Sequence, residues 1–205
     1  MQPDQRTTGL AAVAGGILLG VLDFLWIKSV PYPFAELGNS TATWAVAAFA
    51  FGYWVRSGRV RPALGAAVLL VVAVPSYYLA AALIQGDALA VLWQQSSLFW
   101  ILFGVLAGVV FGIGGTWARR TGWRQIIGSA LPAAVFFEEA ARFVRHANDP
   151  NYPPGAGWNV AIDVALAVLI VALIGRTFRQ RALALVAALP LAAIIFLGFA
   201  LVGGY

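Results

Sequence analysis

Seven apolar segments, separated by short loops that contain charged residues, glycine and proline, account for most of the 205-residue chain. Most of them are about 20 residues long, the length at which an α-helix crosses the hydrocarbon core of a bilayer. The pattern therefore predicts an all-α fold, a bundle of about seven transmembrane helices in a single transmembrane domain, residues 1–205, in which the second span is the shortest. The predicted spans are 9–27, 40–55, 63–84, 97–118, 126–145, 157–175 and 181–203.

The composition supports this prediction and excludes several classes of function. Hydrophobic residues make up 61% of the chain and charged residues only 10%, whereas about a quarter of the residues of a soluble domain are charged. The chain has no cysteine and one histidine, which excludes a thiol nucleophile, a disulfide framework and a site of several histidines. It also lacks the DDxxD motif that would hold magnesium, so we expect no metal ion and no other cofactor.

Basic residues concentrate in alternate loops. Three arginines follow each of the second, fourth and sixth spans, so these loops hold most of the 13 basic residues. Because cytoplasmic loops carry an excess of arginine and lysine, the N-terminus is predicted inside and the C-terminus outside. This topology explains the net charge of +5, and no nucleic-acid partner is expected. The arginines are Arg56, Arg59, Arg61, Arg119, Arg120, Arg124, Arg176, Arg179 and Arg181.

Four acids lie inside predicted spans, where an ionised side chain is costly and therefore points to function. With a rise of about 1.5 Å per helical residue, all four are predicted roughly 5–12 Å below the outer surface. Acids from three helices at one level predict a single chamber that opens outward or toward the outer leaflet. These predicted catalytic residues are Asp23, Glu138, Glu139 and Asp163.

A fifth charged residue, Arg142, follows the two glutamates by one helical turn and can pair with one of them. The other carboxyl group would then keep a proton near neutral pH, as a general acid requires. Structural explanations stay open for each acid. The glutamates and Arg142 could form an ion pair between helices, and Asp163 could hydrogen-bond to Asn159. Asp23 could be an interfacial residue near Lys28.

Aromatic residues are predicted to line the chamber. Ring faces attract cations, so aromatic walls suit a cationic ligand or intermediate, although tryptophan in membrane proteins also forms belts at the two interfaces. The predicted substrate-binding residues are Trp44, Tyr77, Tyr78 and Trp100 at chamber depth, Trp26 and Trp158 nearer the rim, and Phe137, Arg142 and Asn159.

Four stretches of the chain resemble a family of small actinobacterial multi-span membrane proteins of largely unassigned function. They are residues 39–49, 61–65 leading to Tyr77 and Tyr78, 104–119, and the acidic stretch 136–142. Some members of that family resemble membrane-bound, class II type terpene cyclases of bacterial indole-sesquiterpenoid pathways. The resemblance implies a cyclase (isomerase) of terpenoid biosynthesis in the bacterial cytoplasmic membrane.

Such a cyclase would protonate a terminal alkene or epoxide of a prenylated indole or related meroterpenoid precursor, and the carbocation would cyclise without a metal. The DxDD motif of soluble cyclases is absent, so the proton donor is open. We expect Glu138 or Glu139 in this role, with Asp163 or Asp23 in support. Two other functions stay open. One is a small-molecule binding or transport protein, such as the substrate-capturing subunit of an uptake system with an outward-facing acidic, aromatic pocket, and the other is a scaffolding protein.

Overall fold

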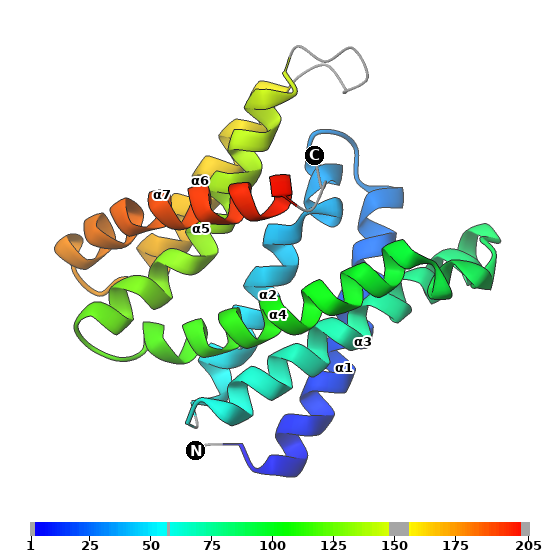
Figure 1. Ribbon diagram of the computed structural model, residues 1–205, viewed down its shortest axis with the longest axis horizontal. Helices are drawn as coiled ribbons and strands as arrows, with labels where there is room; N and C mark the ends of the chain where they lie inside the picture. Colours follow the sequence, from blue (N-terminus) through cyan, green and yellow to red (C-terminus); the bar gives the residue numbers. More distant parts are fainter. Residues whose placement is uncertain (1–2, 57, 148–155, 202–205) are drawn as a thin grey trace. The chain divides into compact units, whose positions relative to one another are not determined.

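The computed structural model describes residues 3–56, 58–147 and 156–201, and these form seven α-helices and two short 3-10 helices without any strand (Figure 1). Each predicted span coincides with one α-helix to within a few residues, so the all-α fold is confirmed. The α-helices are α1 (Gln5–Ser29), α2 (Thr41–Val55), α3 (Val60–Gln85), α4 (Gln95–Ala118), α5 (Trp123–Arg145), α6 (Ala156–Ile174) and α7 (Phe178–Leu201). The 3-10 helices are η1 (Phe34–Asn39) and η2 (Leu89–Trp93).

Five of the helices are long and apolar enough to cross a membrane, namely α1, α3, α4, α6 and α7. By length and composition the chain is therefore an integral membrane protein. The α2 helix has 15 residues, about 22 Å of length, which is less than the roughly 30 Å of a bilayer core. The α5 helix has buried glutamates among its apolar residues. The count of seven spans and the orientation of the termini stay predictions.

The chain divides into two compact units. The first contains residues 1–39 and 43–116, and thus α1, α3, both 3-10 helices and most of α2 and α4. The second contains residues 40–42 and 117–205, and thus the first turn of α2, the end of α4, and α5, α6 and α7. Each candidate site below lies within one unit.

Glycines bring the helices of the first unit into backbone contact. A Cβ atom added at Gly20 of α1 would overlap the carbonyl oxygen of Ala73 on α3, and one added at Gly16 would overlap that of Leu69. Because these contacts advance along both helices in the same direction, α1 and α3 run parallel. Small residues are how apolar helices pack closely in a membrane, where no hydrophobic effect drives them together.

The second unit is organised around α5. This helix packs against both α6 and α7, which contact each other much less. Its interior face combines small apolar residues with polar ones, including Gln125, Ser129, Glu138 and Glu139. The surfaces of α6 and α7 instead expose large apolar side chains such as those of Leu173 and Leu197. Polar groups therefore lie inside this unit and apolar groups outside, the arrangement expected in lipid.

Candidate functional site

Glu139 of α5 caps the N-terminus of α2. The Ser40 Oγ donates a hydrogen bond to Glu139 Oε2 at 2.6 Å, and the Thr41 Oγ1 donates to Oε1 at 2.7 Å. The backbone N–H of Ala42 also donates to Oε1, at 3.2 Å. The first N–H groups of a helix have no partners within the helix and form its positive end, so a carboxylate is favourable there. The cap thus comes from a residue almost a hundred positions away in the chain.

Arg142 completes the surroundings of Glu139. Its Nη2 donates to Glu139 Oε1 at 3.1 Å, as the spacing of one helical turn predicts. The Glu139 side chain is 2% exposed and that of Arg142 is 24% exposed. The ion pair therefore joins a buried carboxylate to an arginine that is partly exposed at the surface of the unit. Both oxygens of Glu139 accept hydrogen bonds, an arrangement that suits a carboxylate, because a carboxylic acid would have to donate one.

Two further acids lie beside this pair. Glu138, the neighbour of Glu139 on α5, and Asp163 on α6 are 0% and 3% exposed. Asp163 is close enough to Glu139, Glu138 and Arg142 to interact with them electrostatically. Its Oδ2 is buried, and no hydrogen-bond donor reaches that oxygen among the described residues. Three of the four predicted catalytic acids are therefore brought together in the second unit, in what we term the acidic centre: Glu138, Glu139, Arg142 and Asp163.

Asn159 and Phe137 adjoin the acidic centre in sequence. Asn159 precedes Asp163 by one turn of α6 and is also buried, whereas Phe137 precedes Glu138 on α5 and is half-buried. Ser129, two to three turns earlier on α5, is buried with an Oγ that has no hydrogen-bond partner in the described part of the chain. Predicted substrate-binding residues are thus present on both helices that carry the acids.

Asp23, the fourth predicted acid, lies in the first unit among aromatic side chains. It is buried, and the side chain of Trp44 hydrogen-bonds to its carboxyl group. Tyr77 is close enough to interact with it electrostatically and packs edge-on against Phe24, with 5.7 Å between ring centroids. Tyr78 in turn lies edge-on to Tyr77 at 5.4 Å. The single chamber predicted for all four acids would span both units and stays a prediction.

The other predicted aromatic residues are more exposed. Trp100 lies edge-on to Phe103 and is 40% exposed. Trp26 is 44% exposed, and its Nε1 donates to the Phe34 carbonyl oxygen at 2.8 Å. Trp158 is 68% exposed. Such exposure suits rings that contact lipid or the interface, which is the belt position considered above.

Sequence reasoning missed Ser40 and Thr41 as partners of Glu139. A Ser-Thr pair before an apolar run is a typical helix start, so their position at the beginning of α2 was available from sequence. Their acceptor was not, because it comes from a helix that is distant in sequence. Within the described residues, no three histidine, aspartate or glutamate side chains are arranged to hold a metal ion.

Comparisons with known proteins give a family but no activity. No curated protein and no solved structure matches the chain. The likeness to terpene cyclases therefore stays a hypothesis based on the motifs described above. A family of unknown function (DUF6518) matches residues 2–204, almost the whole length, and the chain belongs to this family.

Proposed function

We propose that the protein is a membrane-bound terpene cyclase in which Asp163 protonates the prenyl chain of a lipid-soluble substrate. The observation that carries the proposal is the Asp163 Oδ2, a buried oxygen that no donor of residues 3–56, 58–147 or 156–201 reaches, beside a glutamate that is held by several donors. An ionised carboxylate is costly where no donor stabilises it, so a proton on Asp163 is favoured there. A positioned proton on a buried carboxyl group is what general acid catalysis requires.

The contacts of Glu139 support a division of roles among the acids. The oxygens of Glu139 accept hydrogen bonds from Ser40, Thr41 and Arg142. We therefore assign Glu139 a structural role at the start of α2, as a carboxylate that does not donate a proton. Its negative charge can instead stabilise a nearby carbocation. We therefore place the proton on Asp163, which our sequence-based expectation had given only a supporting role. Glu138 stays the second choice.

The chemistry balances without any co-reactant. The Asp163 carboxyl proton adds to the less substituted carbon of the terminal alkene, whose π electrons form the new C–H bond, and the dimethyl-substituted carbon is left as a tertiary carbocation. The internal double bonds then attack in turn and form the ring C–C bonds. The final cation loses a proton to the Asp163 carboxylate, which restores the acid. The product has the same mass as the substrate, and the half-buried Phe137 offers a ring face to the cation.

The apolar exterior of the second unit supports a substrate that arrives through the bilayer. The side chains of Leu169, Leu173 and Leu197 are exposed on α6 and α7, so a prenylated indole or related meroterpenoid precursor would reach this unit from the lipid phase. In this proposal the protein resides in the bacterial cytoplasmic membrane.

Cyclisation in deuterated water tests the proposal. Purified protein in lipid nanodiscs is incubated with prenylated indoles of several chain lengths, and the products are separated by liquid chromatography and mass spectrometry. In ordinary water we expect a new product of unchanged mass. In deuterated water the same product gains one deuterium, because carboxyl protons exchange with solvent. If every substrate stays linear with wild-type protein, the cyclase proposal is wrong.

A second candidate function is the binding of an organic cation at Asp23, in line with the alternative of a small-molecule binding or transport protein. A buried carboxylate with Trp44 and Tyr77 beside it combines the two groups that recognise ammonium ions. Quenching of tryptophan fluorescence by an amphipathic quaternary ammonium compound would measure this binding. We expect Asp23→Asn to abolish it and Asp4→Asn, which removes an exposed acid before the first turn of α1, to leave it unchanged.

A further inference from the structure

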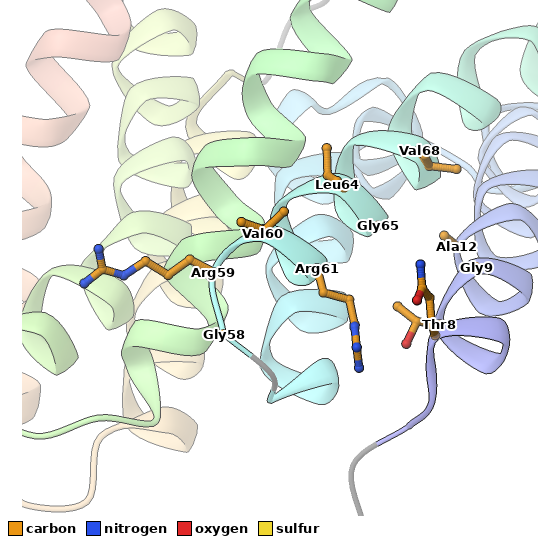
Figure 2. Close-up of a pocket in the computed structure, with 11 residues that line it drawn as sticks. Thr8, Gly9, Ala12, Gly58, Arg59, Val60, Arg61, Leu64, Gly65 and Val68 are labelled. Carbon is orange, nitrogen blue, oxygen red and sulfur yellow. The ribbon is translucent and has the colours of Figure 1, made fainter.

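A groove of about 560 Å³ lies between the first turns of α1 and of α3 in the first unit (Figure 2). It is independent of both acid groups described above. Gln5, Thr8 and Ala12 line it from α1, and Arg61, Leu64 and Val68 line it from α3. Pockets of roughly 300–1,000 Å³ hold small molecules in proteins, so the groove is large enough for part of a lipid.

The lining changes from polar to apolar along the two helices. Gln5 and Arg61 lie in the first turns of α1 and α3, whereas Ala12 and Val68 lie about two turns further on. Because α1 and α3 run parallel, the polar residues gather at one end of the groove and the apolar residues at the other. A phospholipid has the same arrangement, with a polar headgroup at one end and apolar chains at the other.

The polar end of the groove is positively charged. The segments that bound it carry Arg6, Arg56, Arg59 and Arg61 against one acid, Asp4. Arg61 extends toward the start of α1, where its Nη1 donates to the Pro3 carbonyl oxygen at 3.4 Å. In Figure 2 the Arg59 side chain extends away from α1 and from the groove, so Arg59 adds positive charge near the start of α3 and Arg61 is the arginine that lies at the groove.

The start of α3 adds hydrogen-bond donors. No side chain caps it, whereas Asp4 caps the start of α1 by accepting from the Thr7 N–H at 2.7 Å. The N–H groups of Val60 and Arg61 in the first turn of α3 have no acceptor within the helix. Together with the guanidinium group of Arg61 they suit a phosphate group, which arginine binds through two parallel hydrogen bonds.

We propose that this groove binds an anionic phospholipid, with its phosphate at Arg61 and the first turn of α3, the charge of Arg59 nearby, and one acyl chain along Ala12, Leu64 and Val68. An anionic phospholipid fits both ends of the groove, because its phosphate suits the positively charged end and its acyl chain suits the apolar end. The surrounding bilayer contains such lipids. Arginines of membrane proteins are generally attracted to anionic lipid headgroups. In this protein, the groove would place one such lipid at a defined site.

Lipid retention by the purified full-length protein tests the proposal. The protein in detergent is mixed with equal amounts of phosphatidylglycerol and phosphatidylcholine, and bound lipids are counted by native mass spectrometry. We expect preferential retention of phosphatidylglycerol. The double variant Arg59→Gln/Arg61→Gln should lower that retention at least about tenfold. Arg120→Gln/Arg124→Gln removes the same charge from the loop before α5 and the first turn of α5, and should leave it unchanged.

A second pair of variants tests the groove itself. An added Cβ at Gly9, which lines the groove, meets no atom within 4 Å, and the same holds for Gly198 on α7. Gly9→Leu should therefore fill the groove and lower phosphatidylglycerol retention, and Gly198→Leu should not. Circular dichroism and gel filtration confirm that each variant is folded.

Three results would overturn the proposal. One is equal retention of phosphatidylcholine, which would remove the role of charge. Another is an equal loss in Arg120→Gln/Arg124→Gln, which would indicate a general attraction to basic loops. The third is displacement of the lipid by millimolar inorganic phosphate, which would make the groove a site for free phosphate.

Discussion

Among the described residues two carboxylates cap helices, one in each unit, and they differ in burial and in the origin of the cap. Asp4 is exposed and caps its own helix, α1, through the Thr7 N–H three residues later. Glu139 is buried and caps α2 from α5, with the hydroxyl groups of Ser40 and Thr41 as additional donors. Water has access to the exposed start of α1, whereas the buried carboxylate of Glu139 is shielded from water. We therefore expect the loss of the first cap to cost little and the loss of the second to cost much.

The acidic centre contains a second contrast of the same kind. Both oxygens of Glu139 accept hydrogen bonds, whereas the Oδ2 of Asp163 has no donor in the described part of the chain. Buried polar groups are normally satisfied, so a group that is not is a candidate for function. Under the cyclase proposal, the number of donors around each acid therefore distinguishes the structural role of Glu139 from the chemical role of Asp163.

The largest effect is expected from removing the acid of Asp163. Under the cyclase proposal, Asp163→Asn keeps the shape but has no acidic proton, so turnover should fall by about 100-fold or more. The measurement is the rate of cyclised product in nanodiscs. Asp87→Asn, which removes an exposed acid in the loop after α3, serves as the matched control. Full activity in Asp163→Asn would show that another acid donates the proton, and Glu138 would be tested first.

Removal of Glu139 should have the largest effect on stability. Glu139→Ala leaves Arg142, Ser40 and Thr41 without their buried acceptor, and breaking a buried pair in this way costs about 3–5 kcal/mol. Thermal unfolding in detergent, followed by circular dichroism, measures the change. Glu139→Gln should recover part of it, since the amide oxygen still accepts. A loss no greater than that of Asp4→Asn would contradict the contrast between the two caps.

The individual donors should contribute less. Ser40→Ala and Thr41→Ala each remove one hydrogen bond to Glu139 and should lower the free energy of unfolding by about 1 kcal/mol each. In the Glu139→Ala background the same substitutions should cost little, because their acceptor is gone. This double-mutant cycle isolates the coupling between the two helices. Equal losses in both backgrounds would indicate that the hydroxyl groups act elsewhere.

The sequence alone predicted the helices well, because their signal is local. Apolar runs and their breakers placed all seven segments, and the spacing between Glu139 and Arg142 predicted their pairing. The cap of α1 by Asp4 is also local and could be read from the sequence. The cap of α2 could not, because hydropathy gives the depth of a residue and not its direction around the helix. For the same reason the sequence could not show which of the four acids lie side by side: Asp23 lies in the first unit and the other three in the second, and the single chamber for all four stays a prediction.

The smallest effect is expected at Asp4, and its pH dependence identifies it. The hydrogen bond from the Thr7 backbone N–H lowers the pKa of Asp4 below its usual value of 3.8. A group with a lowered pKa stabilises the fold above its unfolded pKa and loses that contribution as the pH falls through the folded value. The difference in Tm between wild type and Asp4→Asn should therefore be constant near pH 6 and shrink below about pH 4.

The control for Asp4→Asn is again Asp87→Asn, which removes an exposed acid that hydrogen-bonds to the Gln85 side chain instead of a helix start. Both variants change the net charge equally, so a difference in Tm between them measures the contribution of the cap of α1. A Tm difference for Asp4→Asn that grows as the pH falls would contradict the sign derived from its lowered pKa. If Asp4→Asn destabilised the protein as much as Glu139→Ala, burial would not be what distinguishes the two caps, and the start of α1 would have to be held by contacts as demanding as those of α2.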